Sequence, residues 1–135
     1  MTHVRFFRSA LFIPFVIPIL MLPLWYIPDA NLPKLFGQFV LYSSVGLIYL
    51  GLPYLLFLGI LWRLIKSLSV AKIILICMLT PLFFSGILFS VFYIFTDLNL
   101  SSFVGFITFA IGYIYAILIL LLFFLGRRLG FVDSV

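Results

Sequence analysis

The stretch Trp62-Arg63-Leu64-Ile65-Lys66-Ser67-Leu68-Ser69-Val70-Ala71-Lys72 decides the fold, because it is the densest cluster of positive charge and lies between two long uncharged runs. These runs, 35–62 and 73–96, each exceed the roughly 20 apolar residues that cross a hydrocarbon core about 30 Å thick. Charged side chains are costly inside a bilayer. We therefore expect residues 62–72, the central loop, to lie in water between two transmembrane helices.

The composition indicates a membrane protein. Of 135 residues, 67% are hydrophobic and 8% are charged, and a small domain in water leaves too much surface exposed to hide that much apolar area. The lipid bilayer is therefore the expected partner of most of the chain. The net charge of +5 is better explained by membrane topology than by nucleic-acid binding. A single cysteine, Cys77, excludes an internal disulfide and a cysteine-based metal cluster.

Outward from the central loop, the apolar runs predict four transmembrane helices. We expect them at about 9–28, 35–62, 70–95 and 102–125, with polar turns at 28–34 and 96–101. The first run resembles a signal peptide but is long and lacks a good cleavage site, so we interpret it as a retained helix. Prolines remove backbone hydrogen bonds, and the predicted kinks are at Pro14, Pro18, Pro53 and Pro81.

Lysine and arginine are strongly biased to one side of the predicted membrane. Lys34 lies on one side, and the other side holds Arg5, Arg8, Arg63, Lys66, Lys72, Arg127 and Arg128. Positive loops face the cytoplasm, so we predict that both termini and the central loop are cytoplasmic. Compactness and short loops favour a bacterial inner membrane, although an internal eukaryotic membrane satisfies the same rules.

Sliding the chain against itself by 66 to 68 residues brings several motifs into register. The matches include Pro14 with Pro81, Tyr26-Ile27 with Tyr93-Ile94, and Gly46-x-Ile48-Tyr49 with Gly112-x-Ile114-Tyr115. Chance matches among Leu, Ile and Phe do not explain Gly, Tyr and Pro in the same order. We predict a single membrane domain, 1–135, with parallel repeats at about 4–64 and 71–129. The expected fold is an all-α integral membrane protein in which two tandem hairpins form a four-helix bundle.

The sharpest polar constellation lies in the two outer turns and consists of Asp29, Asn31, Asp97 and Asn99. Oxygen atoms of this kind bind hard cations such as calcium, and they also suit a contact with a partner protein. The simpler interpretation, which we prefer, is that each pair closes its turn and caps the next helix by accepting backbone N–H bonds. We therefore predict neither a bound metal nor a cofactor.

Glycine and tyrosine near the middles of the helices predict close packing. Residues three apart share a helix face, and small residues let helices approach in lipid. The predicted packing positions are Gly46, Tyr49, Gly105, Gly112, Tyr115 and Ala116. A small-residue stripe on the last predicted helix consists of Ser101, Gly105, Thr108, Gly112 and Ala116. It could pack against the second predicted helix inside the chain or against a second copy, and we favour packing inside the chain. As alternatives, the two tyrosines line a narrow neutral path, or prolines at similar depth form a gate as in transporters.

The distribution of ionisable groups argues against catalysis. No Asp, Glu, Lys, Arg or His lies at membrane depth in the predicted spans, there is no glutamate, and His3 is the only histidine. Proton relays, ion-coupled carriers and catalytic triads need such groups. We expect a non-catalytic protein that acts through helix contacts as an accessory, assembly or inhibitory partner of other membrane proteins, or that self-associates. The alternative is a minimal carrier or pore for a neutral or hydrophobic solute, working as a dimer.

Overall fold

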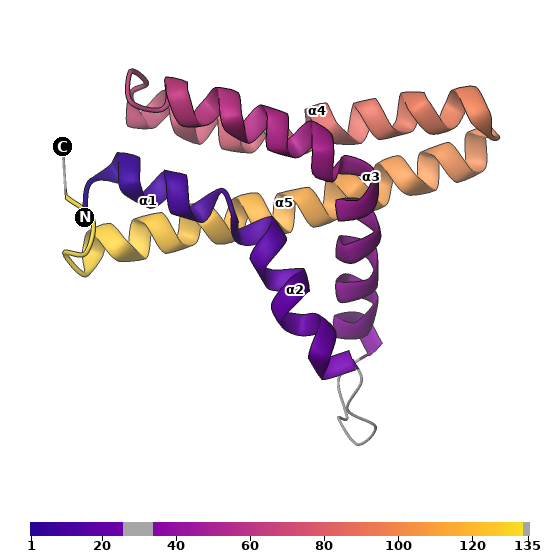
Figure 1. The fold of residues 1–135 in the computed structure, drawn as a ribbon, viewed down its shortest axis with the longest axis horizontal. Coiled ribbons are helices and arrows are strands. Elements are labelled where there is room, and N and C mark those ends of the chain that lie inside the picture. Colours follow the sequence, from indigo (N-terminus) through magenta and orange to yellow (C-terminus); the bar gives the residue numbers. More distant parts are fainter. Residues whose placement is uncertain (26–33, 134–135) are drawn as a thin grey trace.

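The computed structural model describes residues 1–25 and 34–133, which form five helices (Figure 1). Their bounds are α1 His3–Ala10, α2 Ile13–Trp25, α3 Lys34–Leu64, α4 Val70–Phe95 and α5 Leu98–Arg128. Helices α3, α4 and α5 are long and apolar enough to cross a membrane, and α1 with α2 supplies a fourth candidate if the bent pair is one span. The predicted all-helical membrane architecture is confirmed at this level.

The first predicted helix is broken into α1 and α2, with a bend of 44° between them. Pro14 lies at the start of α2 and has no N–H to donate to the carbonyl of Ala10, so the helical ladder fails at this point. At the same break, Phe12 N donates to the carbonyl of Ser9 at 3.2 Å, a three-residue bond in place of the four-residue bond of an α-helix. Proline chemistry visible in the sequence therefore accounts for the position of the break.

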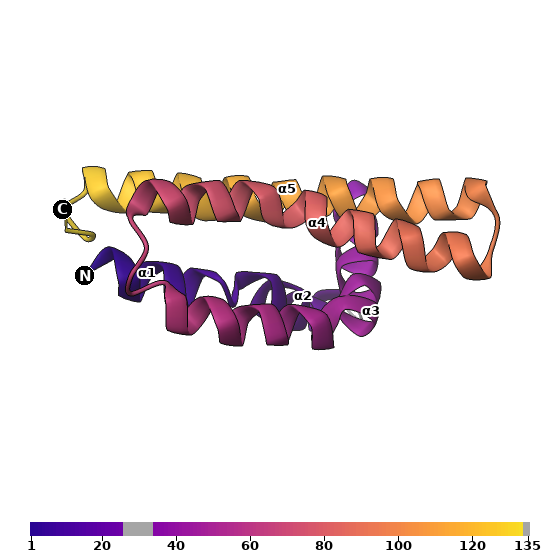
Figure 2. The same cartoon turned by 90° about the horizontal axis from the view of Figure 1, so that it is seen from above.

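Helix α3 changes direction sharply along its length. Its first half lies beside α2, whereas its second half runs back in the same general direction as α4 and α5 (Figures 1 and 2). Pro53 lies inside α3 and leaves the carbonyl of Tyr49 without its helical donor. The loss of that bond is the physical reason for a bend in this helix.

Helices α4 and α5 form an antiparallel hairpin whose helices pack along their length (Figure 2). Glycines of α5 make this close approach possible. A Cβ atom at Gly112 would lie 2.8 Å from Cβ of Pro81, and one at Gly105 would lie 3.2 Å from Cβ of Phe89. At Gly105 and Gly112 the small-residue stripe of α5 thus packs inside the chain, against α4 and not against α3, the second predicted helix.

The core lies at one end of the molecule. There the start of α1, the connection between α3 and α4, and the end of α5 come together (Figure 2). The fully buried members of the core include Phe7, Ile65, Ile73 and Phe123. Ile65 begins the 65–69 connection and Ile73 lies in the first turn of α4, so buried apolar side chains anchor the central loop, which is not wholly exposed.

Polar contacts tie the two ends of the chain together at the same place. The N-terminal amino group donates to the carbonyl of Phe131 at 2.7 Å and lies 3.8 Å from the carboxylate of Asp133. The N–H of Asp133 donates in turn to the carbonyl of Met1 at 3.0 Å. These bonds hold the two ends of the chain together beside the core.

The predicted four-helix bundle and tandem repeat are not confirmed. The second hairpin packs along its length, while the outer parts of α2 and α3 diverge from it (Figure 1). One sequence difference between the two repeats accounts for this divergence: Pro53 of α3 aligns with Ile119 of α5. A proline interrupts one of the two matched helices and not the other, so similar sequences take different shapes.

Candidate functional site

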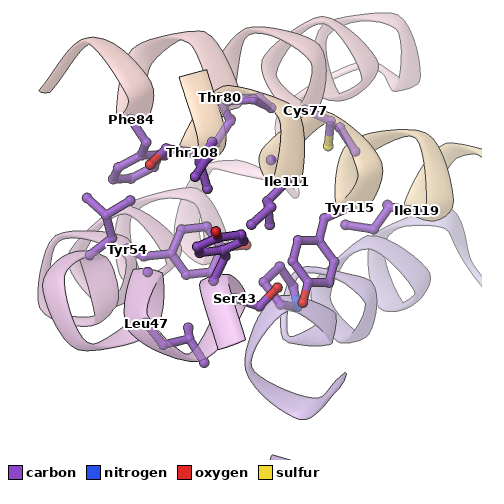
Figure 3. Close-up of a pocket in the computed structure, with 18 of the residues that line it drawn as sticks. Ser43, Leu47, Tyr54, Cys77, Thr80, Phe84, Thr108, Ile111, Tyr115 and Ile119 are labelled. Atoms are coloured by element: carbon purple, nitrogen blue, oxygen red, sulfur yellow. The ribbon is translucent and has the colours of Figure 1, made fainter. Parts of the chain in front are cut away.

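A pocket of about 140 Å³ lies where α2, α3, α4 and α5 meet (Figure 3). It is lined by apolar and hydroxyl-bearing side chains, and no charged residue is among its lining residues within the described part of the chain. Pro14 of α2 and Pro81 of α4 both border it. The helix break and the bent α3 therefore leave a neutral hollow among the predicted spans.

Several predicted packing positions meet at this pocket, namely Gly46, Gly112, Tyr115 and Ala116. Tyr49 does not line it. The Tyr49 side chain is exposed, and its ring lies edge-on to that of Phe92 with 5.6 Å between ring centres. The two tyrosines that the repeat pairs thus have different surroundings.

Of the predicted kink residues, likewise, some line the pocket and others do not. Pro14 and Pro81 line the pocket, Pro18 is buried within α2, and Pro53 is exposed on α3. Helix α4 continues through Pro81 as one element. The hydroxyl of Thr80 bonds back to the carbonyl of Ile76 at 2.6 Å, a bond that strains helices towards a bend.

Ser43 is the site residue that sequence reasoning missed. Within 1–25 and 34–133, it is the one buried or half-buried serine or threonine whose hydroxyl makes no bond to its own helix. Its neighbour Ser44 does so, donating to the carbonyl of Val40 at 2.8 Å. A signal was available, because Ser43, Gly46 and Leu47 share a face at three- and four-residue spacing.

The hydroxyls of Ser43 and Tyr115 lie close together at one side of the pocket (Figure 3). Both are buried, and neither makes a well-formed hydrogen bond with another described residue. The two side chains come from α3 and α5, so only the tertiary fold brings them together. Buried hydroxyls without partners are uncommon, because each loses its bonds to water without replacement.

Tyr54 fixes the bend of the first two helices to α3. Its hydroxyl donates to the carbonyl of Leu11 at 2.9 Å, at the break between α1 and α2. The ring packs against Phe15, with 5.4 Å between ring centres, and edge-on to Phe84 at 5.7 Å. Sequence analysis did not single out Tyr54, since nothing local shows that a distant carbonyl has lost its donor.

The lysines and arginines that are predicted to face the cytoplasm lie at the end of the molecule that holds the core. The exposed members are Arg5, Arg63, Lys66, Lys72, Arg127 and Arg128. Arg8 is different, because its guanidinium donates to the carbonyl of Trp62 at 2.7 Å and sits 4.7 Å from the centre of the indole ring. This cation caps the end of α3 and stacks on an aromatic face.

The outer turn that the structure describes, before α5, provides a helix cap. The carboxylate of Asp97 accepts a bond from Leu100 N at 2.7 Å and so caps α5, while Asn99 is exposed in the first turn of that helix. Asp29 and Asn31 lie outside the described residues. Among the described residues no group of three His, Cys, Asp or Glu is placed to hold a metal ion.

Comparison of the chain with family models, with curated proteins and with solved structures finds no match. The function proposed below is therefore argued from the residues and geometry of this chain.

Proposed function

We propose that this protein is a non-catalytic multi-pass membrane protein that binds transmembrane helices of other membrane proteins, as an accessory, assembly or inhibitory partner. One observation carries the proposal. The outer parts of α2 and α3 turn away from the α4–α5 hairpin (Figure 1), so much of its outer half consists of two helices, which α3 touches through the rings of Tyr42 and Tyr49. In lipid, helix association depends on close packing and small residues rather than on the hydrophobic effect.

The exposed side of α4 has a suitable surface in this region. Gly86 and Ser90 are exposed, lie four residues apart and so share a face. A Cβ atom at Gly86 would meet nothing within 4 Å. This differs from the α5 stripe, which is already used against α4, and it leaves space for the backbone of another helix to approach.

The test is crosslinking in intact cells followed by purification and mass spectrometry. The expected result is a partner recovered in stoichiometric amounts, and Gly86→Leu is expected to reduce its recovery because the larger side chain fills the contact. Gly59→Leu is the matched control, since Gly59 of α3 also has nothing within 4 Å of an added Cβ. The proposal fails if no partner is recovered or if Gly86→Leu leaves recovery unchanged.

Placement in the membrane belongs to the same proposal. We take the protein to lie in a cytoplasmic inner membrane with both termini and the central loop inside, on the bias of Lys and Arg. Gathering of the chain ends at one end of the molecule supports their placement on the same side of the membrane (Figure 2). A fluorescent reporter fused after Val135 is expected to be active in the cytoplasm, and an active periplasmic phosphatase at the same position would reverse the topology.

The tandem repeat and the four-helix bundle remain part of the proposal as well. The sequence matches support a duplicated hairpin, and the meeting of Pro14 with Pro81 and of Gly46 with Gly112 at one pocket is consistent with it. A bundle in the bilayer would require the outer half of α3 to align with α5. Spin-label distances between the outer ends of these two helices in lipid nanodiscs test that alignment.

A carrier or pore for a neutral or hydrophobic solute is the second candidate. The observation that favours it is the neutral pocket, which includes Tyr115 and two of the predicted kink residues. Solute flux into liposomes that contain only this protein would support this candidate. Flux equal to that of protein-free liposomes would remove it and leave the helix-contact proposal untouched.

A further inference from the structure

Two hydroxyls bordering the pocket have an unmet need for a hydrogen-bond acceptor. Ser43 and Tyr115 are 5% and 6% exposed, and neither hydroxyl makes a hydrogen bond of good geometry with any described residue. The pair holds two protons, so even a bond from one hydroxyl to the other leaves one donor without an acceptor. An acceptor atom brought by a ligand recovers the free energy lost when that donor left water.

The remaining pocket lining restricts what the ligand can be. The volume of about 140 Å³ is close to the roughly 150 Å³ of an apolar cavity that holds one benzene molecule. The rings of Tyr42, Tyr54 and Phe84 contribute to the lining, which contains no charged side chain among the described residues. A charged ligand would lose its hydration without gaining a counter-ion.

Water alone does not fill this space. A buried water needs two to four polar partners, and the hydroxyls of Ser43 and Tyr115 can supply two of them. The hydroxyls of Tyr54, Thr80 and Thr108 already donate to the carbonyls of Leu11, Ile76 and Val104 respectively. One or two waters would fill only part of the volume and leave the apolar lining without contacts.

We propose that the pocket binds one neutral, ring-sized molecule whose hydrogen-bond acceptor, such as a ketone oxygen, accepts a bond from the hydroxyl pair of Ser43 and Tyr115. The ligand comes from the bilayer, because the pocket lies among the predicted membrane spans. Binding requires neither a partner protein nor transport, so it goes beyond the helix-contact function. If the protein is instead a carrier, the same proposal names the class of solute that it carries.

Two matched probes test the chemistry in protein-containing lipid nanodiscs. The first is 4-fluoroacetophenone, which has a ring and a ketone, and the second is 1-ethyl-4-fluorobenzene, which has a similar shape and no acceptor. Fluorine NMR titration measures binding of each, with empty nanodiscs correcting for partition into lipid. The expected result is saturable binding with at least a fivefold preference for the ketone. Absence of saturable ketone binding, or equal affinity for the two probes, overturns the proposal.

Single-atom variants test the two donors. Ser43→Ala and Tyr115→Phe are each expected to weaken ketone binding about fivefold, the effect of one ordinary hydrogen bond, and to leave the hydrocarbon probe unchanged. The controls are Ser44→Ala, which removes a hydroxyl bonded to its own helix, and Tyr113→Phe, which lies outside the lining. Full ketone preference in both pocket variants overturns the assignment of the donors.

A filling variant tests the location. Gly46 lines the pocket and Gly51 does not, yet an added Cβ at either position meets nothing within 4 Å. Gly46→Leu is therefore expected to abolish binding of both probes, while Gly51→Leu keeps it. Unchanged binding in Gly46→Leu places the ligand elsewhere. Flux is measured separately, so a protein that binds the ketone without transporting it removes the carrier function and retains this site.

Discussion

Gly112 of α5 and its sequence counterpart Gly46 of α3 allow a quantitative test of helix packing. A Cβ atom at Gly112 would lie 2.8 Å from Cβ and 3.2 Å from Cα of Pro81, whereas a Cβ atom at Gly46 would meet nothing within 4 Å. Ordinary contact begins at 3.4 Å, so α4 and α5 must separate by about 0.6 Å to accept Gly112→Ala. The Pro81 ring is closed onto the backbone and cannot rotate away.

The expected free-energy changes have opposite signs at the two positions. Overpacking costs about 1–3 kcal/mol, whereas alanine gains about 1 kcal/mol over glycine in a helix. Gly112→Ala is therefore expected to lower the free energy of unfolding by about 1 kcal/mol, and Gly46→Ala to raise it by up to about 1 kcal/mol. Gly105→Ala is expected to fall between them, because its Cβ would lie 3.2 Å from Cβ of Phe89.

The assay is reversible unfolding in mixed micelles by titration with sodium dodecyl sulfate, followed by circular dichroism. Stability should decrease in the order Gly46→Ala, Gly105→Ala, Gly112→Ala. An equal loss at Gly46 and Gly112 would refute the packing described here. It would instead favour a symmetric bundle in which the two repeat-related glycines make equivalent contacts.

Three further contacts give predictions measured by the same unfolding assay. Arg8→Ala removes the donor to the carbonyl of Trp62 and the stacked cation, so a loss of about 1–2 kcal/mol is expected. Tyr54→Phe leaves the carbonyl of Leu11 without its donor, at an expected cost of about 1–3 kcal/mol. Asp97→Ala removes the α5 cap and is expected to cost about 1 kcal/mol, while calcium addition raises the melting temperature of neither parent nor variant.

Each of these predictions has a conservative control. Arg5→Ala and Tyr49→Phe change exposed side chains and are expected to alter stability by less than about 0.5 kcal/mol. Asp97→Asn keeps a capping oxygen and is expected to retain most of the stability. A loss at Arg5 equal to that at Arg8, or a calcium-dependent rise in melting temperature that disappears in Asp97→Asn, would contradict the roles assigned here.

Much of the helical architecture could be predicted from the sequence, because it depends on the chemistry of neighbouring residues. The uncharged runs on both sides of Arg63 and Lys66 predicted α3 and α4, and the structure places these helices at Lys34–Leu64 and Val70–Phe95. Pro14 marked the place where the first apolar run breaks. These properties depend on hydrophobicity, charge and backbone donors, all of which belong to single residues or to their nearest neighbours in the chain.

The candidate site depended on the tertiary structure. The sequence places Ser43 on one helix face with Gly46 and Leu47, but it does not show how the Ser43 hydroxyl bonds, or that Tyr115 is buried while its counterpart Tyr49 is exposed. Those differences arise because α3 crosses the α4–α5 hairpin, so that the face around Ser43 lies beside Tyr115 of α5 while Tyr49 lies against Phe92 of α4. The amino-acid types determine which segments leave water. Whether a hydroxyl or a glycine has a neighbour depends on residues that are distant in sequence, and a local sequence pattern does not contain that information.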